Sequence, residues 1–484
     1  MKQLTRRNFL KTSLLCTAAM TLPARSWSQV TGANDSIRIA VIGFGGRGGD
    51  HIHGYRKLAQ SGEKVRVVAL CDVDIDILAN AVKAFHNTGE SVAGFTDVRT
   101  LLEDKNIDAV SIATPNHWHS LAAIWACQAG KDVYVEKPIS HNVWEGRQAV
   151  RAARQHNRIV QAGTQCRSSY GIQEAVEWVR DGNLGKILVA RGLCYKRRKS
   201  IGKVDGPTPV PSNIDYDLWC GPAPKLPLMR AKLHYDWHWV WATGCGDLGN
   251  QGIHQMDLAR WFLGVNELSP RVFSVGGRLG YLDDGETPNT QFVYHDYAKA
   301  PLIFEVRGLP EKTGSEKMGK FMDGDVAVII HCEGGHVLVP NYSKAIVFDK
   351  EGKQIKQFEG AKDHYANFLQ AVRSRTVSDL KADILEGHLS SALCHTGNVS
   401  YRLGSQRPPD EIREQIKGDK EASLTFDRMA EHLAANDVDL AQTKATLGMV
   451  LKMDPKTERF IDNEAANQLL TREYREPFVV PENV

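Results

Sequence analysis

The chain of 484 residues has no apolar run approaching the ~20 residues that cross a bilayer, no internal repeat and no low-complexity segment. Its charges nearly cancel, because 60 basic and 57 acidic residues leave a formal net charge of +3. That balance gives no case for binding nucleic acid or an anionic surface. We therefore expect no nucleic-acid partner, no membrane insertion and a small molecule as the ligand.

Disulfide and metal-binding patterns are missing as well. Nine cysteines are present, and apart from Cys16 they are scattered singly, with no Cys-x-x-Cys pair and no metal-ligand spacing. We expect buried thiols and no metal site.

Residues 1–34 look like an export signal and linker. Thr5-Arg-Arg-Asn-Phe-Leu-Lys11 matches a twin-arginine signal, and a modest apolar run from Leu14 to Leu22 precedes small residues ending near Ser28. A lipoprotein signal at Cys16 fits poorly, and a chance basic N-terminus on a cytoplasmic protein is the alternative. Because this route exports folded proteins, we expect a periplasmic protein that carries its cofactor out.

A glycine-rich turn follows the first strand-like run. The stretch from Ser36 to Gly49 ends in Gly43, Gly45 and Gly48, the spacing of a dinucleotide-binding turn. The first glycine permits the tight turn, the second lets the backbone approach a pyrophosphate, and the third lets the next helix pack closely. The same turn contains Gly46 and Arg47, which we expect to contact the cofactor.

An acid at the end of the second strand supports this interpretation. Val65-Arg-Val-Val-Ala-Leu-Cys-Asp72 ends in a carboxylate, somewhat further from the motif than the usual ~20 residues. A carboxylate there binds the adenosine ribose and repels a 2′-phosphate, which favours NAD over NADP. The alternative is a glycine turn and a strand-end Asp with no ligand.

Two domains follow from the pattern of apolar runs. Residues 35–165 alternate strands and helices, which is typical of a doubly wound parallel sheet of the Rossmann type. Residues 166–484 contain longer strands, which predict an α+β domain with a large, mostly antiparallel sheet and a charged tail from Pro408 that wraps the domains. The expected strands are Ile37–Ile42, Val65–Leu70, Ala109–Ala113, Asp132–Val135 and Ile159–Ala162, then Lys186–Tyr195, Arg271–Gly277, Gln291–Tyr294, Leu302–Val306 and Val326–Cys332.

Lys137 is a catalytic candidate because it follows a strand on the cofactor edge, in Glu136-Lys137-Pro138. A positioned ammonium can hydrogen-bond a substrate hydroxyl and favour its alkoxide, which promotes hydride loss from the same carbon. A solvated surface lysine is the alternative.

His254 is the second catalytic candidate. It lies on a predicted helix from about Gln251 to Leu263, with Asn250 as a plausible N-cap and Gly264 as the stop. Asn250 and His254 are four residues apart and should share a face near a pocket. A structural histidine is the alternative.

Aromatic residues form a third group. Trp237, Trp239 and Trp241 alternate and would share one face of a strand, where indole rings pack a core or stack on the apolar face of a sugar. His238 lies between them, so we keep it and Trp237 as substrate contacts.

Together these segments resemble the glucose-fructose oxidoreductase / inositol dehydrogenase (Gfo/Idh/MocA) family. The resemblance spans residues 37–484 and rests on the glycine turn, Thr114-Pro-Asn116, Glu136-Lys-Pro138 and Gly252-x-His254-x-x-Asp257. It implies a nucleotide domain followed by an α+β domain whose open sheet mediates homo-oligomers, with Lys137 and His254 as the catalytic pair. The segment Ala113–His119 lies at a strand end and should run beneath the nicotinamide or pyrophosphate. We therefore expect the cofactor contacts to include Thr114, Pro115, Asn116, His119, Glu136 and Lys137, and the substrate contacts to include Lys137, Gln165, Tyr195, Asn250 and His254.

One departure matters. Family members commonly have Asp where this chain has Asn250, and an amide cannot stabilise an imidazolium as a carboxylate does. Lys137, or another acid brought in by the fold, would then share the proton.

The leading hypothesis is a periplasmic NAD-dependent dehydrogenase of a sugar or glycoside. The segments Asp215–Pro222 and Glu286–Gln291 resemble exported enzymes that oxidise glycosides at C3, giving 3-keto sugars. Two alternatives stay open: an NAD-dependent glycosidase that oxidises C3 transiently, eliminates the aglycone and adds water, and a sugar sensor without catalysis.

Overall fold

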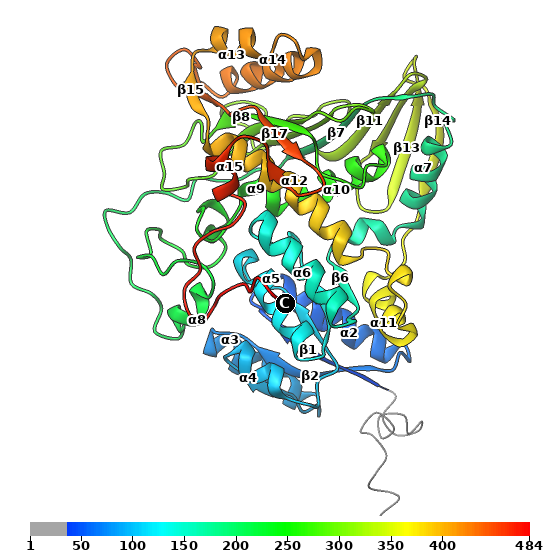
Figure 1. The fold of residues 1–484 in the computed structure, drawn as a ribbon, viewed down its shortest axis with the longest axis vertical. Helices are drawn as coiled ribbons and strands as arrows, with labels where there is room; N and C mark the ends of the chain where they lie inside the picture. The colour runs from blue at the N-terminus through cyan, green and yellow to red at the C-terminus, as the bar shows by residue number, and fades with distance from the viewer. Residues whose placement is uncertain (1–35) are drawn as a thin grey trace, which may run out of the picture.

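A computed structural model describes residues 36–484 (Figure 1). Residues 1–35, and with them the twin-arginine motif containing Arg6 and Arg7, lie outside the described residues.

The N-terminal domain is a six-stranded parallel sheet in the order β3-β2-β1-β4-β5-β6, the lower half of Figure 1. All five expected strands are confirmed. The sheet gains a sixth, β3, which at three residues is too short to show periodicity. The strands are β1 (Ile37–Ile42), β2 (Val65–Cys71), β3 (Ala93–Phe95), β4 (Ala109–Ile112), β5 (Asp132–Val135) and β6 (Val160–Ala162).

Helices cover both faces of this sheet, as a doubly wound fold requires. One face packs against α2 (Arg47–Gln60), α3 (Ile75–Asn87) and α11 (His364–Ser374). The other packs against α4 (Val98–Glu103), α5 (Asn116–Gln128) and α6 (Val143–Gln155).

The second domain is built on a twelve-stranded sheet with the main order β14-β13-β12-β11-β7-β10-β9-β8-β16-β15, and β17 pairs with β8 and β18. Its strands pair antiparallel, except that β10 runs parallel to β7. The strands are β7 (Ile187–Tyr195), β8 (Arg271–Gly277), β9 (Thr290–His295), β10 (Leu302–Arg307), β11 (Val326–Cys332), β12 (Gly335–Val339), β13 (Lys344–Asp349), β14 (Gln354–Glu359), β15 (Ser405–Arg407), β16 (Ala445–Leu447), β17 (Leu451–Asp454) and β18 (Arg459–Phe460).

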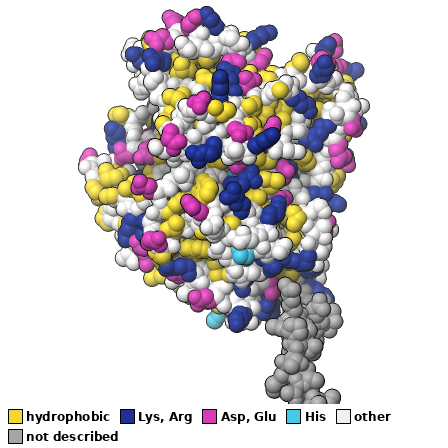
Figure 2. Space-filling view, viewed as in Figure 1, with side chains coloured by type: hydrophobic (Ala, Val, Ile, Leu, Met, Phe, Trp, Pro, Cys, Tyr) yellow, Lys and Arg dark blue, Asp and Glu magenta, His cyan; other side chains and the backbone are white. Residues whose placement is uncertain are grey.

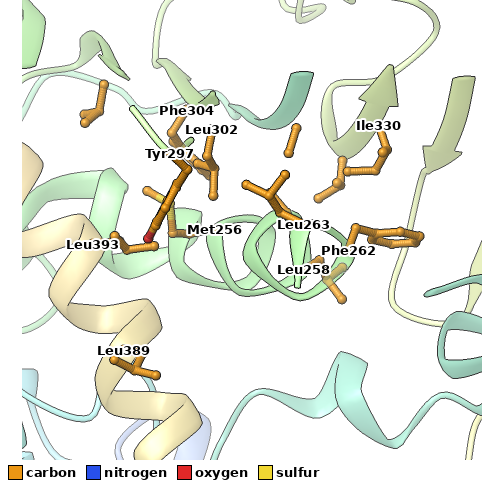
Figure 3. Close-up of a cluster of buried hydrophobic side chains, with 14 of the residues drawn as sticks. Met256, Leu258, Phe262, Leu263, Tyr297, Leu302, Phe304, Ile330, Leu389 and Leu393 are labelled. Atoms are coloured by element: carbon orange, nitrogen blue, oxygen red, sulfur yellow. The ribbon is translucent and has the colours of Figure 1, made fainter. Parts of the chain in front are cut away.

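The inner face of the large sheet carries the main core. Helices α10 (Gly252–Leu263) and α12 (Ile384–Arg402) pack there. Figure 3 shows Met256 of α10 beside Leu393 of α12 and below the strand residues Leu302 and Phe304, with Phe262 further along α10 near Ile330. α7 (Tyr170–Arg180) lies against β13 and β14. On the outer face, α13 (Pro409–Ile416) and α14 (Lys420–Ala434) cover β8, β9 and β10.

Two local predictions near the site were wrong. Asn250 is not a helix N-cap: it is the last residue of a separate short helix, α9 (Gly246–Asn250), and α10 begins only after Gln251, whose backbone is itself helical. The predicted end at Gly264 is confirmed, with a φ of 73°. The tryptophan strand does not form, because Trp237 and Trp239 lie in a 3₁₀ turn, η3 (Asp236–Trp239).

The chain end returns to the first domain (Figure 1). After α15 (Glu464–Gln468), Phe478 and Val480 pack into the core of the nucleotide domain, and Phe478 contacts the Trp118 ring. Arg475 reaches further, to the carboxylate of Asp217 in α8 (Tyr216–Cys220). The tail therefore ties the long segment before α9 to the nucleotide domain.

The distribution of surface charge and the state of the cysteines agree with what the sequence composition predicts. Basic and acidic side chains alternate over the face in Figure 2 without a large area of one sign. The eight cysteines within residues 36–484 are buried and unpaired, as expected. Among the described residues no cluster of three or more His, Cys, Asp or Glu could hold a metal ion, and no helix has the length and apolarity to cross a bilayer.

Candidate active site and cofactor cleft

A cleft of about 400 Å³ lies at the carboxyl edge of the parallel sheet. One wall consists of the turns after β1, β2, β4 and β5, and the other of residues from the irregular segment between β7 and α10. The structure brings together in this lining most of the expected residues: Gly43, Gly45, Gly46, Arg47, Asp72, Thr114, Pro115, Asn116, His119, Glu136, Lys137, Trp237, His238 and Asn250.

The glycine turn leaves no room for side chains at two of its positions. Gly43 has a φ of +74°, and a Cβ there would lie 2.8 Å from the Thr114 backbone. A Cβ on Gly48 would lie 2.0 Å from the carbonyl oxygen of Gly43. Gly46 has open space around it, which leaves the backbone accessible at the start of α2. This cradle fits a dinucleotide pyrophosphate.

Asp72 lies beside this turn, where a ribose is expected. Its carboxylate accepts hydrogen bonds from the backbone N–H of Phe44 at 3.0 Å and of Asp74 at 3.1 Å. Burial raises the pKa of Asp72, and these two hydrogen bonds oppose that shift. The carboxylate is thus fixed at the cleft wall.

Thr114 and Asn116 offer unused polar atoms. The Thr114 Oγ1 and the Asn116 Oδ1 are buried and have no hydrogen-bond partner, while the Asn116 amide donates to the Cys245 sulfur at 3.0 Å. Buried polar atoms are usually satisfied, so these two are available to a ligand. His119 instead holds the backbone, since its ring nitrogens lie 2.6 Å from the Pro138 oxygen and 2.8 Å from the Thr114 oxygen.

Glu136 links the helix after the glycine turn to the turn that follows β5, which carries Lys137. Its carboxylate accepts from Arg47 Nε at 3.0 Å, lies 3.1 Å from His51 Nε2 and accepts from Gln165 Nε2 at 3.1 Å. Burial alone would raise the pKa of Glu136, but the contacts with His51 and the charges of Lys137 and Arg47 hold it well below its usual range. Gln165 is therefore placed against Glu136 and the Tyr134 hydroxyl, beside the cleft and outside its lining.

Lys137 projects toward the second domain. Its Nζ donates to the Asn250 carbonyl oxygen at 3.1 Å, across 113 residues of sequence. Burial lowers the pKa of Lys137; Glu136 opposes this shift, and the charges of Arg47 and Lys196 add to it. A lysine in these surroundings is closer to its neutral, proton-accepting form than a solvated one.

His254 lies on α10, outside the cleft lining but within electrostatic reach of Lys137. It is 3% exposed, its Nδ1 is buried without a partner, and its ring lies 4.9 Å from the Tyr342 ring. Burial, followed by the charge of Lys137, lowers the pKa of His254 well below the usual value. The imidazole is therefore neutral at neutral pH.

The fold also supplies an acid that the sequence analysis missed. Asp247 in α9 is buried and forms a two-point ion pair with Arg198, at 2.9 and 2.7 Å. Its charge acts to raise the pKa of Lys137, so it lies within electrostatic reach of that amine. The sequence feature that could have identified Asp247 is its spacing, since it precedes Asn250 by three residues and His254 by seven.

The facing wall presents stacked rings. The rings of Trp237 and His238 stack at 3.6 Å between centroids, and both residues line the cleft. Trp239 is buried under the Arg198 guanidinium, and Trp241 lies beside Tyr401. The three tryptophans thus point to different surroundings, because the 3₁₀ turn breaks their alternation.

Tyr195 is misplaced in the sequence prediction. On β7, Ala190 and Cys194 pack in the core that contains α10, so Tyr195 points to the opposite face of the sheet. Its hydroxyl donates to Glu305 at 2.6 Å. Sheet alternation therefore removes Tyr195 from the substrate site.

The segment between β7 and α9 is clasped to the nucleotide domain. Asp74 accepts a hydrogen bond from the Asn213 amide at 2.8 Å and lies 3.3 Å from the His234 ring. The backbone N–H of Ile75 donates to the Asn213 oxygen at 3.1 Å. These contacts hold the second wall over the cleft.

A parallel-sheet nucleotide domain whose Glu136–Pro138 turn faces a helix of a second α/β domain is the arrangement of two-domain, dinucleotide-dependent enzymes. Family models match both domains: "Oxidoreductase family, NAD-binding Rossmann fold" over residues 37–164, and "Oxidoreductase family, C-terminal alpha/beta domain" over residues 186–433. The chain belongs to the Gfo/Idh/MocA oxidoreductase family, and its cofactor is NAD.

Curated relatives match part of the chain. A glycosyl hydrolase family 109 protein of Shewanella sp. (strain ANA-3) is 33% identical over 162 residues, covering 29% of this chain and 35% of its own. Inositol 2-dehydrogenase of Salmonella typhimurium is 27% identical, covering 33% and 46%. Levoglucosan dehydrogenase of Pseudarthrobacter phenanthrenivorans is 25% identical, covering 52% and 60%. The match thus spans between about a third and three-fifths of these relatives.

Solved structures share the fold. The WlbA dehydrogenase from Bordetella pertussis, in complex with NADH and UDP-GlcNAcA, superimposes with a TM-score of 0.54 at 20% identity, covering 74% of this chain and 94% of that one. A levoglucosan dehydrogenase with NADH and levoglucosan gives a TM-score of 0.55 at 18% identity, covering 74% and 95%.

Proposed function

We propose that this protein oxidises a hydroxyl of a sugar or glycoside with NAD, and catalyses the reverse reduction. The observation that carries the proposal is the contact between the Lys137 amine and the Asn250 carbonyl, in the same cleft as the glycine turn. Inositol and levoglucosan dehydrogenases among the relatives support a polyol or sugar as the substrate.

The residues of the cleft would have distinct roles in binding the cofactor and the sugar. Gly43, Gly45 and Gly48 hold the pyrophosphate, and Asp72 holds the ribose. When bound, NAD accepts the hydride from the carbon that carries the hydroxyl. The opposite wall, with Trp237 and His238, excludes water and packs on the sugar.

Lys137 would accept the hydroxyl proton at its Nζ. Burial and two neighbouring cations lower its pKa, so the neutral amine is available. Once protonated, the ammonium is stabilised by the Asn250 carbonyl and the carboxylates of Glu136 and Asp247. His254, neutral and with an unpaired Nδ1, orients the hydroxyl through a hydrogen bond. Asp247 thus supplies a negative charge within reach of the Lys137 amine, which the neutral amide of Asn250 does not.

Oxidation at C3 and a periplasmic location are the finer parts of the proposal. The C3 position is supported by the segments Asp215–Pro222 and Glu286–Gln291, and location by the Thr5–Lys11 motif. Replacing Arg6 and Arg7 by Lys should keep the protein in the cytoplasm, measured by fractionation, with a periplasmic reporter on another export route as the control. Unchanged periplasmic recovery contradicts the localisation.

The second candidate function is an NAD-dependent glycosidase. The similarity to a glycosyl hydrolase family 109 protein favours it, while Lys137 in Glu136-Lys-Pro138 favours dehydrogenation, since relatives that eliminate the aglycone usually lack this lysine. The two reactions begin alike and differ in whether the glycosidic bond breaks.

One experiment separates the functions. The natively purified protein is analysed by mass spectrometry for bound NAD and oligomeric state, and then mixed with a panel of glycosides while NAD absorbance is followed. Reduction of bound NAD with a keto-glycoside as product supports the dehydrogenase. Free aglycone and an unoxidised sugar would establish the glycosidase, and no reaction of any glycoside would contradict both.

A further inference from the structure

A second cavity, of about 260 Å³, is lined only by residues of the second domain. Tyr235 lines both this cavity and the cofactor cleft, so the two spaces meet at this residue. The Trp239 ring lies in the same cavity lining. Two aromatic rings beside a sugar site are suited to the apolar face of another ring.

The backbone at Tyr235 is held in a rare conformation. Its φ is 67° and its ψ is −49°, and the Asp236 N–H donates to the His234 oxygen at 2.9 Å. These values define a γ-turn of the positive-φ form, which is strained for any residue with a Cβ. The turn presents Tyr235 to solvent at 52% exposure, while its hydroxyl accepts from Arg198 at 2.7 Å. Strain of this kind is typically kept where it positions a functional side chain.

The cavity is basic and mostly uncompensated. Arg197, Lys199 and Lys232 line it, and none of the three forms an ion pair within residues 36–484. Arg197 donates through Nη1 to the Tyr281 hydroxyl at 3.0 Å, while its Nε is buried with no hydrogen-bond partner. Arg198, the fourth cation of the lining, is neutralised by Asp247.

Asp236 is the acid of the lining, and burial raises its pKa. In a chain whose total charge nearly balances, three unpaired cations around one cavity are complementary to an anion.

We infer that the second cavity binds the part of a glycoside that lies beyond the oxidised ring, and that this part carries a carboxylate or another anion. The inference rests on the proposed function, and it names the substrate class: an acidic glycoside, longer than a single sugar. Tyr235 stacks on the second unit, and Arg197, Lys199 and Lys232 meet its charge.

The test uses the NAD-loaded protein and a matched pair of probes, 4-carboxyphenyl glucoside and its neutral methyl ester, in both anomers and as the galactosides. Binding is measured by isothermal titration at low and high salt. We expect about tenfold tighter binding of the carboxylate, the scale of one charge-assisted hydrogen bond, and a smaller difference at high salt.

Three variants locate the effect. Lys199→Gln combined with Lys232→Gln should remove the preference for the carboxylate and leave the ester unchanged. Tyr235→Gly tolerates the positive φ and should weaken both probes. Lys203→Gln, an exposed lysine outside the lining, is the control and should change neither.

Equal binding of acid and ester by the wild type, or a preference that survives the double variant, would overturn the inference. Failure of the proposed dehydrogenase function would give a different result from failure of the acidic subsite. Reduction of bound NAD by both probes without a charge preference retains the dehydrogenase and rejects the acidic subsite. Charge-dependent binding without NAD reduction retains the subsite and rejects the dehydrogenase.

Discussion

One wall of the cofactor cleft consists of the turns that follow β1, β2, β4 and β5, and the wall facing it belongs to the irregular segment between β7 and α10. The first wall is fixed by the hydrogen-bond ladder of a parallel sheet, which places every strand end on one edge. The second is fixed by side-chain contacts such as Arg198 with Asp247 and Asn213 with Asp74. Changes to the backbone of the first wall should therefore weaken cofactor binding strongly, and the loss of one side-chain contact of the second should have a smaller effect.

The largest effect is expected at Lys137, where the two walls meet. Lys137→Ala should lower the rate of hydride transfer by ~10²-fold or more, the scale of a positioned acid or base, while NAD stays bound. His254→Ala should cost less, because its depressed pKa makes it the weaker base. Single-turnover reduction of bound NAD measures both, with bound NAD quantified by mass spectrometry. A wild-type rate in Lys137→Ala would refute the mechanism.

Gly48 tests the first wall. In Gly48→Ala the new Cβ would meet the Gly43 oxygen at 2.0 Å, so the turn must open. We expect NAD affinity to fall by about 100-fold, roughly 3 kcal/mol, the scale of local backbone strain. Gly49→Ala is the matched control, since it lies in the same helix outside the cleft lining and its Cβ would meet only the Phe44 oxygen, at an ordinary 3.9 Å. Similar affinities of the two variants, measured by titration of the apoprotein, would contradict the cradle.

The pH dependence of the hydride-transfer rate tests whether charges around the cleft set the pKa of Lys137. Burial lowers the pKa of Lys137 from its ordinary 10.5, so the proton-accepting amine forms at a lower pH than usual, and the rate should rise with pH through that lowered pKa. Lys196→Gln removes a cation that adds to the shift, so its rate profile should move to higher pH. Lys203→Gln serves as the control. A profile that does not move, or moves to lower pH, would exclude Lys137 as the base.

The smallest effect is expected at the clasp of the second wall. Asn213→Ala removes the hydrogen bond to Asp74, worth about 0.5–1.5 kcal/mol, and should speed NAD release by about 2- to 10-fold. Release is followed by exchange with labelled NAD. Asn183→Ala, whose amide bonds only to the Trp178 oxygen, is the control. If both variants release NAD at the wild-type rate, the clasp does not retain the cofactor.

The sequence was sufficient for the elements whose signal is local. Five parallel strands appear as predicted because each is a short, apolar run between turns, and the glycine spacing identified the cofactor edge. Prediction from the sequence failed where a local pattern competes with tertiary contacts. The alternating tryptophans read as a strand, but the Tyr235 turn and the contacts of Arg198 bend that segment into a 3₁₀ helix.

The sequence by itself thus determined the parallel sheet, the NAD turn and the candidacy of Lys137 and His254, since these follow from spacing along a few residues. Only the tertiary structure decided that Lys137 meets the Asn250 carbonyl, that the charge of Asp247 reaches Lys137, and that Tyr195 faces away from the site. The physical reason is that burial and charge act through space, so Lys196 and Asp247, far from Lys137 in the sequence, still contribute to its pKa.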